Sequence, residues 1–340
     1  MKPKVSILIV NWNGLKWLNP CLESVRGQTY KNIEVIIVDN DSKDSSVQFL
    51  NENFPEMHVV QSGSNLGFAG GNDFGLKYCN GDYIYLLNND TILEKDCVEE
   101  LVLFMERDPK IAAAQSKMVL LNDREKLDVV GSFWTNTGFL FHFGYQGDAA
   151  KKAYNEPLKV FSNKGASMML RKSAIDKVGF FDEDFWCYYE ETDLCHRLWL
   201  VGYECWYAPK AVMYHAGGGT SLTFDNSYIQ FHNFKNKLLS FVKNFEVATL
   251  LKFIFIYFAI NMLLSIYWLF SGKPKHFLAL YKAIGWNVKQ FPRTLAKRRE
   301  IQAMRTRSDR EILRGVQRNP GADYYVDALT GRLGRYANKA

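Results

Sequence analysis

Short apolar segments alternate with helix-like segments between Val5 and Leu87, and this alternation limits the fold more than any other feature of the chain. The strand-like segments are Val5 to Val10, Ile33 to Asp39, His58 to Gln61 and Tyr83 to Leu87, and the helix-like segments are Leu15 to Gln28, Ser45 to Asn53 and Gly67 to Cys79. Strands that alternate with helices pair in parallel, because each helix carries the chain back across the sheet. The sequence therefore predicts an α/β fold with crossover helices.

Polar residues follow each of these strands. They are Asn11 and Asn13, then Asp39, Asn40 and Asp41, then Asn65, and finally Asn88, Asn89 and Asp90. Open α/β sheets bind ligands at the carboxyl ends of their strands, so this polar edge suits a nucleotide. Asp39 can accept hydrogen bonds from a ribose or a base there, and the alternative is that it only caps a turn.

A glycine-rich segment, Asn65 to Asn72, follows the third strand and opens a helix. It matches neither the dinucleotide-binding fingerprint nor the Lys-Ser/Thr ending of a Walker loop. Its glycines either let the backbone approach a ligand closely at a helix start or simply form a tight turn. The sequence leaves these two readings open.

Three separated clusters are able to close around one metal-bound diphosphate, which favours an enzyme over a binding module. They are Asn88 to Asp90 after a buried strand, the acidic run Glu190 to Asp193, and His215 between a strand-like run and the glycines at 217–219. Carboxylate oxygens and imidazole nitrogen are ligands for divalent metals. Asp193 and Arg197 are four residues apart, so they either pair or bind phosphate.

Several motifs together resemble family 2 glycosyltransferases of the GT-A fold over roughly Val5 to Gly219. The motifs are Val-Ser-Ile-Leu-Ile-Val-Asn-Trp-Asn-Gly at 5–14, Val-Asp-Asn-Asp-Ser at 38–42, Asn-Leu-Gly-Phe-Ala-Gly-Gly-Asn at 65–72 and Leu-Leu-Asn-Asn-Asp at 86–90. The later stretch from Gly179 to Arg197, followed by Gly202-Tyr203, is similar to the rhamnosyltransferase-like branch of that family.

The resemblance implies an inverting sugar transfer from a nucleotide-diphosphate donor with a divalent cation, Mg²⁺ or Mn²⁺, at an Asp-X-Asp motif. That motif reads Asn88-Asn89-Asp90 here, so Asp90 is its one carboxylate and Asn88 offers a dipole. The resemblance also implies that His215 is a metal ligand. One carboxylate and one imidazole are sufficient when the donor phosphates and water complete the coordination shell.

The resemblance further assigns a catalytic base that activates the acceptor hydroxyl. Glu191 takes the position of the Asp in the family's Glu-Asp pair, and Glu190 is the second candidate for this role. Adjacent residues at a helix start point in different directions, so we expect one of them to face the acceptor. The alternative is an acidic helix N-terminus that the helix dipole favours.

The implied donor is a nucleotide-diphospho-sugar, dTDP-L-rhamnose, and the alternative is a UDP-hexose. The residues expected to bind the donor are Asn11, Asn13, Asp39, Asp41, Asn65, Gly67, Asn72, Asn88 and Asn89. The expected acceptor is lipid-linked or a glycan. A hypothesis of a different class is a non-catalytic sugar-nucleotide-binding membrane scaffold with a decayed site, because the first acid of the metal motif is missing.

An uncharged apolar run from Phe253 to Phe270 is at the lower edge of membrane-spanning length. A cluster of Lys and Arg between Lys273 and Arg314 supplies much of the net charge of +6, whereas acids and bases are interleaved before it. The interleaved charges argue against a nucleic-acid-binding domain in the first two thirds of the chain. Tyr257, Tyr267 and Trp268 suit the lipid headgroup level and the basic residues suit anionic lipid, so we expect membrane contact, either spanning or interfacial. A buried core helix is the alternative.

The chain is expected to divide into a GT-A domain at 1–230 and a helical, membrane-associating region at 231–340. The start of the chain has no signal-peptide pattern, which predicts a catalytic domain at the cytoplasmic face of the membrane. Six scattered cysteines without metal-site spacing predict reduced structural thiols. The sequence leaves open whether the chain forms a homo-oligomer.

Overall fold

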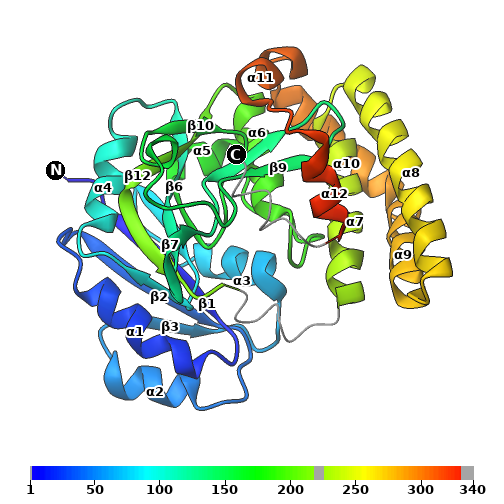
Figure 1. Cartoon of the computed structure of the whole chain (residues 1–340). Helices are drawn as coiled ribbons and strands as arrows, with labels where there is room; N and C mark the ends of the chain where they lie inside the picture. Colours follow the sequence, from blue (N-terminus) through cyan, green and yellow to red (C-terminus); the bar gives the residue numbers. More distant parts are fainter. Residues whose placement is uncertain (1, 218–225, 331–340) are drawn as a thin grey trace.

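The computed structural model describes residues 2–217 and 226–330 (Figure 1). The strands are β1 (Val5–Asn11), β2 (Ile33–Asp39), β3 (His58–Gln61), β4 (Tyr83–Leu87), β5 (Thr91–Leu93), β6 (Ile111–Leu120), β7 (Asp123–Leu127), β8 (Gly131–Trp134), β9 (Leu140–Phe143), β10 (Leu158–Val160), β11 (Ser167–Arg171) and β12 (Glu204–His215). The helices are α1 (Leu15–Arg26), α2 (Ser46–Asn53), α3 (Gly67–Leu76), α4 (Cys97–Met105), the 3₁₀ helix η1 (Lys152–Tyr154), α5 (Lys172–Val178), α6 (Glu190–Leu200), α7 (Asn226–Asn244), α8 (Val247–Phe270), α9 (Pro274–Lys289), α10 (Phe291–Met304), α11 (Asp309–Val316) and α12 (Ala322–Thr330).

A mixed sheet of ten strands forms the centre of the described molecule, with the main order β10-β12-β6-β11-β4-β1-β2-β3. The strands β4, β1, β2 and β3 are parallel, as the alternating pattern predicts. Strand β11 runs antiparallel to both β4 and β6, and β12 runs parallel to β6. Strand β12 therefore points in the same direction as β4, and the carboxyl ends of both strands reach the same edge of the sheet.

Helices cover both faces of the sheet, because successive residues of each buried strand point to opposite sides. Leu8 of β1 packs in a core with α3, α5 and α6, whereas its neighbours Ile7 and Ile9 pack in a second core with α1, α2 and α4. Helix α1 buries Leu18, Cys21, Leu22 and Val25, which is the spacing of one helical face. All six cysteines lie in the described part of the chain and are free thiols.

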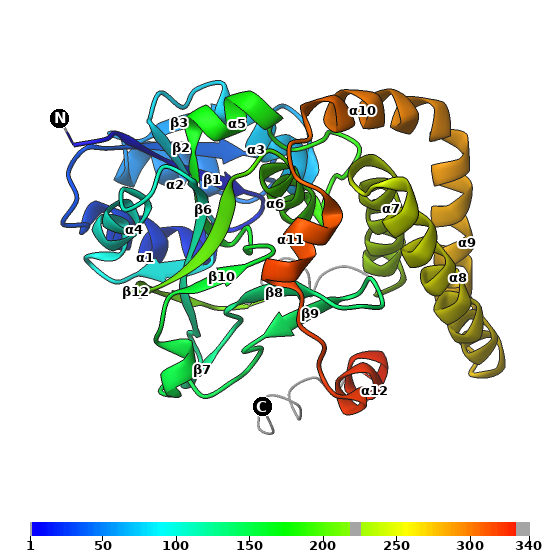
Figure 2. The same ribbon diagram turned by 90° about the horizontal axis from the view of Figure 1, so that it is seen from above.

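The helices after β12 pack against one side of this α/β unit (Figure 2). Helix α7 contacts α6, α8, α9 and α10, and α11 returns to contact α6, β8 and β10. The expected domain boundary after residue 230 falls inside α7, so the first turns of that helix precede the boundary. The division into two domains stays a prediction.

Helix α8 corresponds to the apolar run of the sequence and is the one helix of the described residues long and apolar enough to cross a membrane. Only 17% of its most apolar window is buried, which distinguishes it from a core helix of a soluble protein. The buried side carries Phe253, Tyr257, Asn261, Ser265 and Trp268, a stripe at helical spacing. The outer side is apolar and exposed.

Candidate functional site

The metal motif and the predicted histidine meet at the carboxyl edge of the sheet. Asp90 lies in the turn between β4 and β5, and β5 pairs antiparallel with the end of β12, where His215 is opposite Thr91. The backbone N–H of Ala216 donates to the carbonyl of Asp90. As a result, His215 Nε2 lies 3.4 Å from Asp90 Oδ1. Residues 125 positions apart in the chain are thus brought together by strand pairing.

A second carboxylate, Asp128, holds the other ring nitrogen of this histidine. His215 Nδ1 lies 2.8 Å from Asp128 Oδ2. Burial opposes a charged imidazole, but the hydrogen bonds and negative charges of Asp128 and Asp90 outweigh it and raise the pKa of His215 to about 10. The position between these two carboxylates therefore favours positive charge.

The residues at this edge fit a divalent cation. Two ligands on adjacent corners of an octahedral ion, each at about 2.1 Å, lie about 3 Å apart, close to the spacing of Asp90 Oδ1 and His215 Nε2. Asp128 then takes the outer position that orients a metal-bound imidazole. The described residues contain no group of three or more His, Cys, Asp or Glu side chains arranged as a complete metal site. A cation here would need donor oxygens from substrate or water as well.

The glycine-rich segment is held by Asn40, a residue of the polar edge that is not among the predicted donor-binding residues. Asn40 is buried; its Nδ2 donates to Asn65 Oδ1 and to the carbonyl of Gly67, both at 3.1 Å, and its Oδ1 accepts from the N–H of Leu66 at 2.9 Å. Gly67 has φ +70, and a Cβ there would lie 2.4 Å from the carbonyl oxygen of Trp186. A glycine is therefore required where this segment meets the loop before α6.

Five predicted donor-binding residues lie beside the cavity described below rather than in its wall: Asn11, Asn13, Asp39, Asp41 and Asn72. Asn11 Oδ1 accepts from Asn89 Nδ2 at 2.7 Å and so supports the metal motif. Asp39 is buried, and its Oδ2 accepts from the N–H of Ser42 at 3.2 Å, as in a turn cap. Its Oδ1 is buried without a hydrogen-bond partner among the described residues. The donor-binding role of these five residues stays a prediction.

Glu190 and Glu191 form the first turn of α6 and both line the cavity. Glu190 Oε2 has no hydrogen-bond partner among the described residues. Burial, followed by the nearby charge of Glu191, raises the pKa of Glu190 well above its ordinary value. Glu191 Oε1 lies 3.8 Å from the ammonium of Lys164. Glu190 therefore favours its protonated form, whereas Glu191 lies beside the ammonium of Lys164.

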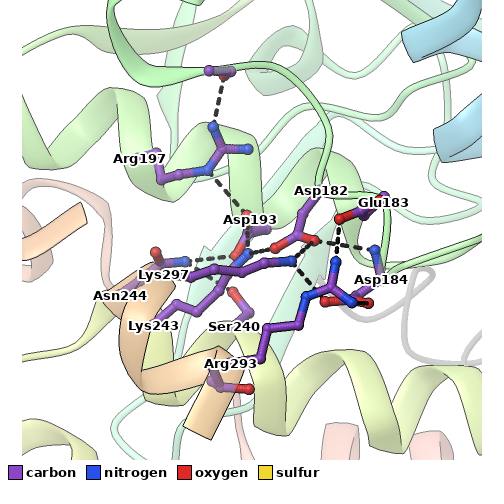
Figure 3. Close-up of polar contacts among 12 residues, drawn as sticks. Asp182, Glu183, Asp184, Asp193, Arg197, Ser240, Lys243, Asn244, Arg293 and Lys297 are labelled. Carbon is purple, nitrogen blue, oxygen red and sulfur yellow. Dashed lines mark hydrogen bonds and ion pairs between the residues drawn. The ribbon is translucent and has the colours of Figure 1, made fainter. Parts of the chain in front are cut away.

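Asp193 and Arg197 pair with each other inside the protein instead of facing a ligand. Arg197 Nε lies 3.0 Å from Asp193 Oδ2, and both side chains are buried (Figure 3). The two terminal guanidinium nitrogens of Arg197 donate to the carbonyls of Val178, Gly179 and Phe180. This arrangement fixes α6 against the preceding segment.

The predicted clusters surround one cavity of about 620 Å³. Eight predicted residues line it: Asn65, Gly67, Asn88, Asn89, Asp90, Glu190, Glu191 and His215. Further lining residues that the sequence analysis did not select as site residues include Trp12, Asn40, Asp128, His142, Tyr145 and Lys164. Asn40 lies between Asp39 and Asp41 in the sequence, so its position at the end of the second strand was a usable signal. Asp128, His142 and Tyr145 lie around the β8–β9 hairpin, in a segment without clear periodicity.

Comparisons with known proteins match the chain to one family and one fold. A family model described as glycosyl transferase family 2 matches residues 6–179, slightly more than half of the 340 residues. The low-salt glycan biosynthesis hexosyltransferase Agl10 of Haloferax volcanii is 27% identical over 247 residues, which is 71% of this chain and 76% of that protein. The poly-beta-1,6-N-acetyl-D-glucosamine synthase of Staphylococcus epidermidis is 24% identical over 211 residues, 61% of this chain and 48% of the synthase. The chain thus spans about half the length of the synthase.

A solved structure shares the fold over nearly the whole chain. The mannosyltransferase PcManGT from Pyrobaculum calidifontis, in complex with GDP-Man and Mn²⁺, has a TM-score of 0.52 and 14% identity, with 93% of this chain and 86% of that one covered. At this identity the likeness establishes the fold alone. It confirms the α/β, GT-A-like architecture predicted from the motifs.

Proposed function

The chain belongs to glycosyl transferase family 2, and from that premise we propose that it transfers a sugar from a nucleotide-diphosphate donor to a lipid-linked or polysaccharide acceptor. One observation carries the proposal. Asp90, Glu191 and His215 come from three distant parts of the chain and line one cavity of about 620 Å³. A cavity of this size is in the range of small-ligand sites, and it combines a catalytic carboxylate with a metal-binding pair.

Glu191 is the proposed base of an inverting transfer. The base takes the proton of the acceptor hydroxyl while that oxygen attacks the sugar opposite the departing diphosphate. A base must hold negative charge, and Glu190 favours its protonated form because of burial and the adjacent carboxylate. Glu191 is the better candidate for that reason, and Lys164 at 3.8 Å stabilises its charge.

Asp90 and His215 are the proposed metal ligands, with Mg²⁺ or Mn²⁺ as the ion. A bound divalent cation would offset the negative charge that develops on the departing diphosphate. Asn88 and Asn89 provide neutral amide groups at the same place, and Asn11 fixes the side chain of Asn89. Asp128 keeps the Nδ1 side of His215 occupied, so that Nε2 is directed toward Asp90.

The donor that we favour is dTDP-L-rhamnose, because the sequence from Gly179 to Arg197 is similar to the rhamnosyltransferase-like branch. A UDP-hexose is the second candidate, and the hexosyltransferase name of the Haloferax relative favours it. The reaction takes place, in this proposal, at the cytoplasmic face of the membrane, where the exposed apolar side of α8 contacts lipid.

The test is a panel of purified nucleotide sugars that includes dTDP-rhamnose and UDP-hexoses, each with and without Mg²⁺ or Mn²⁺ and with membrane lipid extract as the acceptor source. We expect metal-dependent release of one nucleoside diphosphate. Glu191→Gln should lower turnover by about 10²–10⁴-fold and leave nucleotide affinity within severalfold. Glu190→Gln is the matched comparison, and its loss should be smaller because burial and the charge of Glu191 raise the pKa of Glu190.

Two outcomes contradict parts of this proposal. Turnover of Glu191→Gln at the wild-type rate would remove Glu191 as the base and move the role to Glu190. Nucleotide binding by the wild type without turnover of any donor, with lipid extract present, would favour the non-catalytic scaffold instead.

A further inference from the structure

The loop that leads into α6 has an unusual backbone conformation. Trp186, Tyr188 and Tyr189 have φ values of +62, +66 and +76. Residues other than glycine rarely adopt this left-handed backbone conformation. Bulky residues keep it only where surrounding contacts impose it. Trp186 and Tyr188 also line the cavity, and Glu190 follows directly. The positions of Glu190 and Glu191 therefore depend on the contacts that stabilise this loop.

The side chain of Asn236 on α7 supplies that support. Its Nδ2 lies 3.0 Å from the carbonyl oxygen of Phe185, 2.8 Å from that of Cys187 and 2.6 Å from that of Tyr188. Asn236 is fully buried. One buried amide group thus lies within hydrogen-bond distance of three carbonyls between residues 185 and 188, and within the loop the N–H of Cys187 also donates to the carbonyl of Phe185.

Two neighbours of Asn236 contact the same loop. The ring of His232, one turn earlier in α7, stacks on the indole of Trp186 with centroids 5.2 Å apart and planes at 28°. Lys235 Nζ donates to the carbonyl of Asp184. Both side chains are buried, so α7 presents a continuous face to the loop.

The two ends of the loop are held by ion pairs from the same helical region. Figure 3 shows Lys243 of α7 and Lys297 of α10 pointing at the carboxylates before the loop and on α6. Lys243 Nζ lies 2.6 Å from Asp182 and 3.1 Å from Asp193, and Lys297 Nζ lies 2.6 Å from Asp184. The loop start and the catalytic helix are therefore fixed to one support, and Asn236 acts between them.

We propose that Asn236 is a positioning residue for sugar transfer, and that it sets the conformation of residues 185–189 so that Glu190 and Glu191 face the cavity. This inference rests on the proposed function, because the base it positions is the proposed one. It assigns part of catalysis to a helix outside the residues that the family model matches. Asn236 acts through the loop and does not line the cavity itself.

The test compares Asn236→Ala with Asn233→Ala, whose native side chain donates to the carbonyl of Ile229 in its own helix. Hydrogen–deuterium exchange of the full-length protein is measured first, because it needs no turnover. In Asn236→Ala the amides of 184–190 should exchange about tenfold faster or more, and in Asn233→Ala they should exchange at the wild-type rate.

Turnover is then measured with the nucleotide sugar that the wild type uses. We expect kcat to fall about 100-fold with a smaller change in the donor KM, because a misplaced base weakens the chemical step.

Unchanged exchange in the 184–190 segment would overturn the inference whether or not the wild type turns over a donor. Faster exchange with wild-type kcat would also overturn it, because the loop would then be loosened without consequence for the base. A third outcome separates the two proposals. If the wild type turns over no donor but exchange is faster in Asn236→Ala, the proposed function is contradicted, while the result still shows that Asn236 holds the loop. If Asn236→Ala does not fold, Asn236→Ser keeps one donor and should give an intermediate exchange rate. Wild-type exchange in that variant would count against the proposal.

Discussion

At the scale of single residues, the geometry of the proposed metal site depends on Asp128 as much as on the two proposed ligands. Asp128 bonds to His215 Nδ1 at 2.8 Å and so selects the ring orientation that turns Nε2 toward Asp90. A carboxylate in this outer position fixes the tautomer and raises the basicity of a ligating imidazole. Loss of its charge should therefore weaken metal binding without removing a ligand.

We predict that Asp128→Asn, which keeps the size of the side chain, lowers the apparent affinity for Mn²⁺ about 10–100-fold. Isothermal titration with Mn²⁺ in the presence of the nucleoside diphosphate that the wild type releases measures the affinity. Asp123→Asn on β7 is the control, because Asp123 pairs with exposed Lys126. An equal Mn²⁺ affinity in Asp128→Asn and the wild type would remove Asp128 from the metal site.

At the scale of secondary structure elements, the contact between α6 and α7 depends on a buried ammonium. Lys243 bonds to both Asp182 and Asp193. Burial acts to raise the pKa of each carboxyl, but the lysines around Asp182 and the Lys243 and Arg197 charges around Asp193 outweigh it, so both pKa values are lowered. A lowered pKa in the folded state stabilises the fold above the unfolded-state value of about 3.9 and loses that effect below it.

We predict that Lys243→Met lowers the free energy of unfolding by about 3–5 kcal/mol, because each of two buried carboxylates loses one of its two cationic partners. Urea denaturation at pH 7 measures it. The control Lys126→Met removes a cation from an exposed pair and should change stability little.

The wild type should also lose stability as the pH falls below about 4, and a flat profile between pH 5 and pH 2.5 would contradict this reading of the ion pairs.

Elements with a strong local period were predictable from the sequence, and contacts between distant elements were not. Strand β2 has the predicted bounds, Ile33–Asp39, because a buried strand shows its apolar run directly. Asp90, Glu191 and His215 are candidates because they lie in recognisable motifs, and their roles stay predictions. Asp128 and Asn236 carry no such signal, since their roles arise from strand pairing and from the docking of α7. The antiparallel insertion of β11 between β4 and β6 is likewise a property of the assembled sheet.

At the scale of the whole molecule, α8 and α9 lie side by side away from the parallel strands (Figure 2). The distribution of polar and apolar side chains on α8 is the reverse of that on a surface helix of a soluble protein. In α8 the side chains of Asn261 and Ser265 are buried, whereas Phe255 and Leu263 are 76% and 69% exposed. An outer face of this kind is more stable against hydrocarbon than against water. The 24 residues of α8 are about 36 Å long, enough for a bilayer core of about 30 Å.

We predict that the double substitution Phe255→Asp, Leu263→Asp releases the protein from membranes, because charge on the outer face of α8 opposes insertion. Co-sedimentation with vesicles that contain anionic lipid measures the bound fraction. The control is Leu103→Asp on α4, an apolar residue 55% exposed on the α/β unit. Equal sedimentation of the double variant and the wild type would mean that α8 is not the membrane-contacting surface.

The bonds from Asn236 to the loop at 185–188 also determine which parts of such enzymes can be exchanged in a chimera. A hybrid that joins this α/β unit to the helices of a relative would keep the left-handed loop and lose the amide that fits it. The exchangeable module is therefore discontinuous in sequence. It consists of residues 182–189 together with α7, and a designer who moves one of them has to move the other.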